Sequence, residues 1–158
     1  MVAYLDRAIR DGHVTLIGEG NHQRIHYHAV DLRERYADPE EKVRAEFWAE
    51  LIYVYGYEPH KLGIEVTIPD RTPIDRADIV VFHDTARKRP FAVIECKSDG
   101  ISDAEFSQAV EQACGNGMQA KFRASYVGVV AGNTRRFLDF SSEEYGVLER
   151  EANIIADL

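Results

Sequence analysis

Apolar and polar residues along the middle of the chain follow a pattern that predicts two adjacent strands. Residues 76–82 and 91–97 are short apolar runs joined by a charged turn. Each run contains an acid where an apolar residue is expected, Asp78 in the first and Glu95 in the second. Because successive side chains of a strand point to opposite faces, Glu95 and Lys97 share one face. If the two strands pair, Asp78 comes close to both of these charged side chains.

In other segments, apolar residues recur at the spacing of a helix or of a strand. Residues 38–56 begin with an acidic N-cap and a proline and carry apolar residues at helical spacing, which predicts a helix ending near Gly56. A Ser-x-x-Glu capping box predicts a second helix from Asp103 to about Gly115. The other elements that the pattern predicts are strands at residues 13–17, 24–30, 62–68, 125–131 and 136–140 and a C-terminal helix capped by residues 141–144.

The order of these elements predicts an α/β fold with a mixed sheet flanked by helices. A strand, a helix at residues 103–115 and a further strand predict a right-handed parallel crossover. We expect residues 1–36 to form an N-terminal β-hairpin extension of a core at residues 37–141. Residues 142–158 are expected to form a C-terminal helix without a stop signal, which favours a fragment of a larger protein over a stand-alone domain.

Composition and charge narrow the functions that are open to the chain. Its 158 residues are 45% hydrophobic and 29% charged, as in a soluble globular domain. No apolar run approaches the roughly 20 residues that span a bilayer, and no signal-peptide pattern begins the chain. We therefore expect a cytoplasmic protein without a membrane partner. The net charge of -8 argues against tight DNA binding unless the basic residues gather on one face or other domains supply affinity.

Two other polar clusters allow both a structural and a functional interpretation. His26 and His28 are two apart on a predicted strand, which is a ligand spacing, but no Cys or acid cluster completes a metal-binding set. A solvated face of the hairpin is therefore favoured. Residues 87–89, Arg-Lys-Arg in the turn between the central strands, either contact phosphates or form a solvated hairpin tip.

The charged residues of the two central strands suit a magnesium site. Mg²⁺ takes oxygen ligands and keeps several waters, so Asp78 and Glu95 suffice as side-chain ligands, with the backbone carbonyl of Cys96 as a third. A bound cation polarises a phosphate oxygen and lowers the pKa of its water, and Lys97 can orient that water and offset developing charge. The reaction indicated is in-line hydrolysis of a phosphodiester. From the residues alone, a purely structural Asp–Glu–Lys network is an equal alternative.

The sequence resembles a nuclease family. Asp78, then Glu95-x-Lys97 at the end of the next strand, then a helix carrying glutamines, is similar to the PD-(D/E)XK nuclease motif. Over roughly residues 38–140, the wider sequence resembles the N-terminal nuclease domain of type I restriction enzyme R subunits. The segments that carry this likeness are Glu40-Glu41-Lys42-Val43-Arg44, Gly56-Tyr57, Arg76-Ala77-Asp78-Ile79-Val80, Ala92-Val93-Ile94-Glu95-Cys96-Lys97-Ser98 and Gln112-Ala113.

The resemblance implies roles for particular residues. Asp78 and Glu95 are implied as metal ligands and Lys97 as the catalytic lysine. The family's glutamine, in a Gln-x-x-x-Tyr type of motif, falls on Gln112 or one turn earlier, and Asn116 stands where the tyrosine is expected. The further residues implied are Gln108 and Ser98 for DNA contact, together with Gln112, and Glu46 in the first helix for assistance to the metal.

The resemblance also implies an activity and partners. It predicts a restriction-endonuclease-like three-layer fold and an Mg²⁺-dependent endonuclease, with Mn²⁺ as a possible substitute, that cleaves double-stranded DNA in a type I-like restriction-modification system. The chain contains no ATP-binding loop and no methyltransferase motif, so motor, methylation and specificity domains or subunits are expected as partners. Two alternatives stay open: a non-catalytic DNA- or subunit-docking module of the same fold, and a repair or recombination nuclease.

Overall fold

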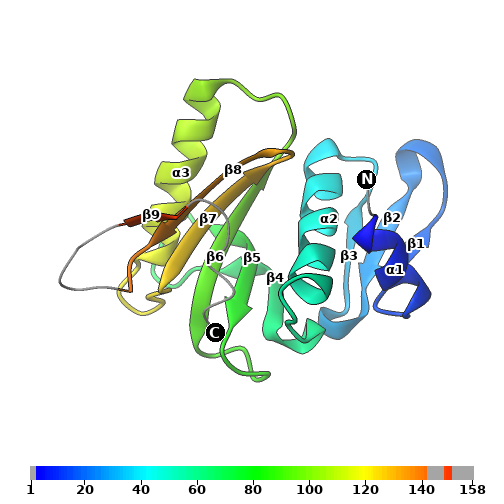
Figure 1. The fold of residues 1–158 in the computed structure, drawn as a ribbon, viewed down its shortest axis with the longest axis horizontal. Helices are drawn as coiled ribbons and strands as arrows, with labels where there is room; N and C mark the ends of the chain where they lie inside the picture. The colour runs from blue at the N-terminus through cyan, green and yellow to red at the C-terminus, as the bar shows by residue number, and fades with distance from the viewer. Residues whose placement is uncertain (1–2, 142–147, 151–158) are drawn as a thin grey trace.

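The computed structural model describes residues 3–141 and 148–150 of the chain. Within those residues the helices and strands form a six-stranded sheet, a three-stranded sheet and the helices around them (Figure 1). The elements in order are α1 Tyr4–Arg10, β1 Val14–Ile17, η1 Gly20–His22, β2 Arg24–Tyr27, η2 His28–Val30, β3 Leu32–Arg35, α2 Pro39–Tyr53, η3 Pro59–Lys61, β4 Leu62–Thr67, β5 Arg76–Phe82, β6 Pro90–Lys97, α3 Asp103–Gly117, β7 Tyr126–Ala131, β8 Thr134–Asp139 and β9 Leu148–Arg150.

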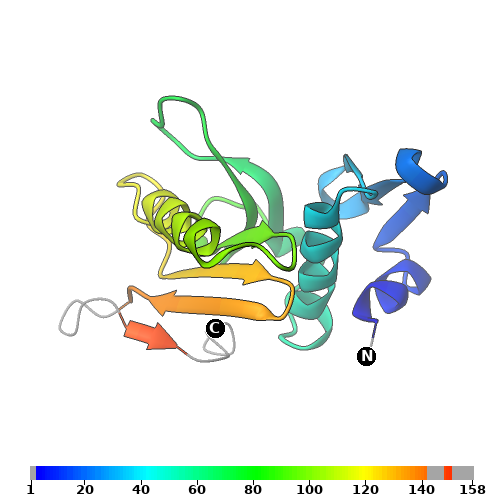
Figure 2. The same cartoon turned by 90° about the horizontal axis from the view of Figure 1, so that it is seen from above.

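The larger sheet is mixed and carries a helix on each face. Its strand order is β4-β5-β6-β7-β8-β9, in which β6 and β7 run parallel and the other neighbours antiparallel. Figure 2 shows α2 and α3 on different sides of this sheet. Along β6, Ile94 and Cys96 pack in the core with α2, whereas Val93 packs in a separate cluster on the opposite face. Because successive side chains alternate between the faces of a sheet, this one buries both of its sides. The predicted fold class, a mixed sheet flanked by helices, is confirmed.

Helix α2 forms where its sequence signals predicted it. The side chain of Asp38 accepts a hydrogen bond from the backbone N–H of Glu40 at 2.9 Å, and Pro39 occupies the first turn, where its missing N–H costs nothing. The helix lies between the two sheets (Figure 1). It is therefore buried on two sides, which is why Phe47, Trp48 and Leu51 are all inaccessible to solvent.

Helix α3 covers the other face of the larger sheet. Ser102 caps it by accepting a hydrogen bond from the backbone N–H of Glu105 at 3.1 Å. Ala109 and Ala113 pack against β7. At Gly117 the helix approaches the sheet so closely that an added Cβ would lie 2.5 Å from the side chain of Val127. Small residues on this side of α3 thus set the distance between helix and sheet.

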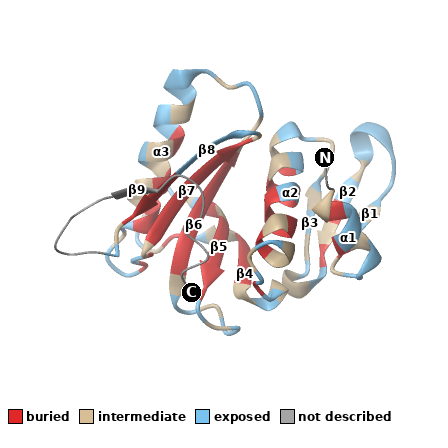
Figure 3. Cartoon of the chain, in the orientation of Figure 1, coloured by how far each residue is buried: buried red, intermediate tan, exposed pale blue. Residues whose placement is uncertain are grey.

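The N-terminal region is larger than the hairpin that the sequence predicts. Strands β1 and β2 pair antiparallel as expected, and β3 adds a third strand that was not predicted. The sequence of β3, Leu-Arg-Glu-Arg, contains a single apolar residue, so its pattern is weak. The inner face of this sheet buries Val14, Ile25 and Tyr27 in the same core as α2, whereas its outer face is largely exposed (Figure 3).

The C-terminal helix prediction is wrong at residues 148–150. These residues form β9, which pairs antiparallel with β8. By pairing with β8, this strand supplies hydrogen-bond partners for backbone N–H and C=O groups of β8, which a helix at these residues would leave unpaired. The rest of the predicted helix, residues 142–147 and 151–158, lies outside the described residues. In the described ranges, no helix has the length and apolar character needed to cross a membrane.

Candidate active site

Strands β5 and β6 bring Asp78 and Glu95 together. Ile79 lies opposite Ile94 in the antiparallel pairing of β5 and β6. The adjacent positions, one residue before Ile79 and one residue after Ile94, are Asp78 and Glu95. Their carboxyl groups are close enough to share a hydrogen bond. The backbone N–H of Cys96 donates a hydrogen bond of 2.7 Å to Oδ2 of Asp78. This bond fixes the orientation of the Asp78 carboxylate relative to β6.

Glu95 is the most unusual group in this arrangement. It is 2% exposed, and its Oε1 atom has no hydrogen-bond partner among the described residues. Burial and the adjacent Asp78 carboxylate raise the pKa of Glu95 to about 10. Burial also raises the pKa of Asp78, against the opposing effect of the Cys96 N–H. At neutral pH the pair therefore holds a proton, unless a cation takes its place.

Lys97 follows at the end of β6, half-buried beside the first turn of α2. Its Nζ lies 3.9 Å from Oε1 of Glu40. Burial raises the pKa of Glu40, and the positive charge of Lys97 opposes that rise. Lys97 likewise opposes the rise in the pKa of Glu95. The structure thus places the ammonium group of Lys97 within electrostatic reach of the Asp78–Glu95 pair.

An acidic pocket of about 130 Å³ opens beside Asp78 on the α2 side of the sheet. Carboxylates from β3, α2, β4 and β5 and the segment before α2 surround it, and a single guanidinium group offsets their charge. The residues that line the pocket are Glu34, Asp38, Glu40, Glu41, Arg44, Glu65, Asp78 and Cys96.

Arg44 is the positive charge at the centre of this pocket. It is buried, and its Nε donates to Oε2 of Glu41 at 3.0 Å, while its terminal nitrogens donate to Glu41 and Glu65. Nη1 of Arg44 lies 3.7 Å from Oδ1 of Asp78. The hydroxyl of Tyr27 donates to the same Glu41 carboxylate at 2.6 Å. The sequence reasoning missed this cluster, although the i, i+3 spacing of Glu41 and Arg44 on a helix was a usable signal.

Gln112 reaches the site from α3 through an acid that was not predicted. Its Nε2 lies 3.3 Å and 3.4 Å from the two carboxylate oxygens of Asp75. Asp75 immediately precedes β5, and its charge contributes to the raised pKa of Glu95. Asp75 also forms an ion pair with Arg71, whose Nη2 lies 3.9 Å from Oδ2 of Asp75. Gln108, one helical turn before Gln112, is exposed.

Residues 39–150 of the chain match the family described as type I restriction enzyme R protein N terminus (HSDR_N). The chain belongs to this family. The matched segment runs from α2 to β9 and contains Arg44, Asp78, Glu95 and Lys97, whereas the three-stranded sheet precedes it. No curated protein matches the chain.

Two positions singled out by the R-subunit resemblance, Asn116 and Ser98, lie in contrasting surroundings. Asn116, at the expected tyrosine position, is completely buried, and neither its amide nitrogen nor its amide oxygen has a partner among the described residues. Asn116 therefore belongs to the interior between α3 and the sheet. Ser98 is half-buried directly after β6, next to Lys97 in the chain.

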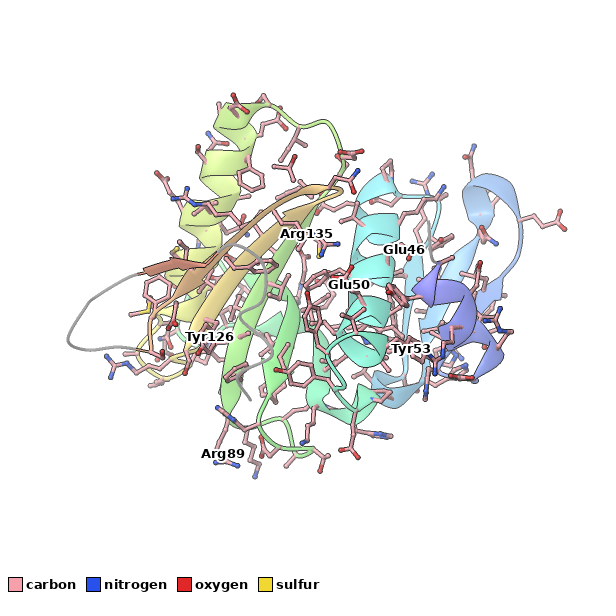
Figure 4. The ribbon with its side chains drawn as sticks, viewed as in Figure 1. Glu46, Glu50, Tyr53, Arg89, Tyr126 and Arg135 are labelled. Carbon is pink, nitrogen blue, oxygen red and sulfur yellow. The ribbon has the colours of Figure 1, made fainter. Side chains whose placement is uncertain are left out.

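Glu46 is not brought to the site. It is exposed on the side of α2 that faces α1, where its carboxylate interacts with the backbone of Leu5 and the charge of Asp6 (Figure 4). Five residues after Glu41, it is rotated by about 140° around an α-helix that turns about 100° per residue. The acids of α2 that line the pocket together with Asp78 are instead Glu40 and Glu41, six and five residues before Glu46.

The donor set at Asp78 and Glu95 fits a hard divalent cation. Within residues 3–141 and 148–150, no group of three or more His, Cys, Asp or Glu side chains is arranged to hold a metal ion. Mg²⁺ commonly needs only one or two carboxylates because it keeps several waters. The unpartnered Oε1 atom of Glu95 and its contact with a second carboxyl group are what such a cation would relieve. Cys96, which lines the pocket, is a free thiol whose pKa is raised by burial.

The histidines of the N-terminal sheet are engaged in local hydrogen bonds. Nε2 of His26 lies 2.8 Å from Oδ1 of Asp31, and Nε2 of His28 lies 2.7 Å from Oγ1 of Thr15. Their rings also contact each other, with centroids 4.3 Å apart. The His28 side chain is exposed, as the solvated-face interpretation expects, whereas the His26 side chain is only 12% exposed, so that interpretation is wrong for His26.

Proposed function

We propose that the chain is the Mg²⁺-dependent endonuclease domain of a type I-like restriction system and hydrolyses phosphodiester bonds of double-stranded DNA, with Mn²⁺ as a possible substitute. The observation that carries the proposal is the contact between the half-buried carboxyl group of Asp78 and the buried carboxyl group of Glu95, whose Oε1 atom has no partner among the described residues. Two carboxylates in contact are unfavourable unless a proton or a cation lies with them. Membership of the R-protein family and the PD-(D/E)XK-like order of Asp78, Glu95 and Lys97 support the same reaction.

In this proposal each residue of the site has a separate task. Asp78 and Glu95 hold Mg²⁺ with the backbone carbonyl of Cys96. When bound, Mg²⁺ supplies a polarised phosphate oxygen and a water of lowered pKa. The N–H of Cys96 keeps the Asp78 carboxylate oriented. Lys97 orients the attacking water and offsets negative charge that develops on the phosphate, as this water forms a new P–O bond and the P–O bond to the leaving oxygen breaks.

The DNA contacts come from α3 and the end of β6. Gln108 is exposed on α3 and Ser98 follows Lys97, so both can meet a phosphate next to the one that is cut. Gln112 is bonded to Asp75, which gives it a positioning role between α3 and the strand that carries Asp78. The net charge of -8 fits a cutting domain that shares its DNA affinity with motor, methylation and specificity partners.

Plasmid cleavage tests the assignment. The purified chain is incubated with supercoiled DNA and Mg²⁺ or Mn²⁺, beside the Glu95→Gln and Lys97→Met variants. The expected result is metal-dependent nicking that falls by about 100-fold or more in both variants, the usual scale for loss of an electrostatic catalytic group. Glu111→Gln on the exposed side of α3 and Lys121→Met in the turn after α3 are matched controls and should retain wild-type nicking. Nicking that persists in both site variants contradicts the proposed site.

One observation favours a non-catalytic docking module instead, namely that the expected tyrosine position is occupied by Asn116, whose side chain is completely buried and away from solvent. Calorimetric titration with Mg²⁺ separates the two functions. The nuclease requires binding by the wild type and its loss in Glu95→Gln. A wild type that binds duplex DNA but neither binds Mg²⁺ nor nicks the plasmid supports the docking module.

A further inference from the structure

The outer face of the N-terminal sheet carries a row of arginines that the proposed chemistry does not use. Alternation along its strands turns Val14, Ile25 and Tyr27 to the core and polar side chains outward. Much of this face is exposed (Figure 3), and the strands that carry it precede the segment matched to the R-protein family. We refer to it as the arginine face; its outward residues are Thr15, Ile17, Arg24, His26, Arg33 and Arg35.

The register of the sheet sets like charges against each other on this face. Arg24 lies directly opposite Arg35 in the β2–β3 ladder. Like charges at directly opposed positions of an antiparallel pair destabilise a sheet. This arrangement lowers the stability of the sheet, so the stability of the fold does not explain why the arginines are there.

The described part of the chain provides little compensation for this charge. Asp31 lies 2.8 Å from His26 and 3.6 Å from Arg33. Arg24 and Arg35 form no ion pair with any residue that the structure describes. Each uses one donor on a backbone carbonyl: Nη2 of Arg24 on Arg33 at 3.4 Å and Nε of Arg35 on Asn21 at 3.2 Å. Both guanidinium groups retain exposed N–H donors.

The arginine face is adjacent to the candidate active site. On β3, Glu34 lies between Arg33 and Arg35 and points to the opposite side, where it lines the acidic pocket together with Asp78. Asp38, three residues after Arg35, lines the same pocket. A single strand thus separates the acidic pocket from the arginine face.

We propose that the arginine face binds the phosphate backbone of duplex DNA beside the cutting site, an inference that rests on the proposed nuclease function. The acidic pocket repels phosphates, so a chain of net charge -8 needs a local cationic surface to hold DNA near Asp78. Guanidinium groups present paired donors that match phosphate oxygens. A polyanion lying across Arg24 and Arg35 also removes the like-charge repulsion between them.

A charge-matched pair of variants tests this surface. In the first, Arg24, Arg33 and Arg35 are each changed to Gln; in the second, Lys121, Arg123 and Arg136 are each changed to Gln. The control residues are exposed and lie outside the three-stranded sheet, two of them between α3 and β7 and the third on β8. Both variants lose the same formal charge. Binding of a short fluorescent DNA duplex is measured by anisotropy in EDTA over a range of salt concentrations.

The first variant should bind DNA about 10-fold more weakly or worse, and its slope of log K against log salt should decrease by roughly 2 to 3, since each phosphate contact contributes about 0.9. The control should retain the wild-type affinity and slope. The melting temperature of the first variant should stay equal to that of the wild type or rise, because like-charge pairs are removed; a fall would indicate a structural role and overturn the proposal.

The outcomes distinguish this inference from the function on which it rests. Equal weakening in both variants reveals a general charge effect and overturns the inference. Wild-type DNA binding by the first variant also overturns it, and points to an acidic protein surface as the partner of this face. If the wild type nicks plasmid DNA while the first variant binds normally, the nuclease stands and the arginine face alone fails. A wild type that binds no duplex at low salt overturns the arginine face, whereas the nuclease assignment is decided separately by plasmid nicking and Mg²⁺ titration.

Discussion

The two sides of Asp78 handle buried negative charge in opposite ways. On the α2 side, Oδ1 faces Arg44, which also binds Glu41 and Glu65. On the other side, Asp78 meets Glu95, whose Oε1 atom has no partner in the described part of the chain. The negative charges of Glu41 and Glu65 are therefore balanced by Arg44, whereas Glu95 has no cation in contact among the described residues.

This difference separates a structural cluster from a site prepared for a ligand. Burial lowers the pKa of Arg44, but its hydrogen bonds and charge interaction with Glu41 more than reverse that effect, so the guanidinium stays charged. Glu95 has no such counter-charge in contact and keeps a proton instead. A buried group that the fold leaves incompletely satisfied is a candidate for binding something that the chain does not provide.

Removal of Arg44 should have the largest effect on stability. Arg44→Met leaves the buried carboxylate of Glu41 and the half-buried carboxylate of Glu65 without this counter-charge. The loss of one partner of a buried ion pair typically costs about 3–5 kcal/mol. The free energy of unfolding in urea measures the loss.

The control for this variant is Arg135→Met, because Arg135 forms an ion pair with Glu50 at 2.6 Å that is more exposed (Figure 4). Such a pair is worth about 0–1 kcal/mol. Equal urea midpoints for Arg44→Met and the wild type would show that the acids on the α2 side do not depend on Arg44.

The second prediction concerns the pH dependence that Glu95 imposes. Its pKa is raised from 4.5 to about 10, so the fold favours the protonated form. The stabilising contribution is complete below the ordinary pKa and declines as the pH rises towards 10. Glu95→Gln mimics the protonated group, so in EDTA its melting temperature should exceed that of the wild type by several degrees at alkaline pH and by less at acidic pH.

Thermal unfolding between about pH 5 and about pH 9 checks this sign. Glu111→Gln, on the exposed surface of α3, serves as the control and should follow the wild type. Addition of Mg²⁺ should restore the wild type at alkaline pH without affecting Glu95→Gln. Parallel curves for the wild type and Glu95→Gln would mean that Glu95 is compensated after all.

The smallest effect is expected at the edge of the compensated cluster. Tyr27→Phe removes the hydroxyl that donates to Glu41, but Glu41 keeps its bonds to Arg44. A loss of about 1 kcal/mol is expected, the usual net value of one hydrogen bond. Urea unfolding measures it, and plasmid nicking should be unchanged. A loss as large as that of Arg44→Met would show that the Tyr27 hydroxyl, and not Arg44, dominates the cluster.

Sequence patterns predicted most of the elements because the forces behind them are local. The strands around Asp78 and Glu95 follow from apolar runs of strand length, and α2 and α3 follow from the caps at Asp38 and Ser102. Strand β3 was missed because its one apolar residue, Leu32, gives no period. Residues 148–150 were misassigned because a strand on the edge of β8 depends on a partner rather than on its own pattern.

The sequence by itself determined the order of the elements from α2 to β8 and the juxtaposition of Asp78, Glu95 and Lys97, since the caps, the adjacent strands and a period of two suffice for these. Only the tertiary structure decided which acids are compensated. Arg44 meets Glu65 from β4, Gln112 on α3 meets Asp75 just before β5, and packing turned Glu41 rather than Glu46 towards Asp78. The energy of a buried charge depends on neighbours that are distant in the chain, and no local pattern encodes them.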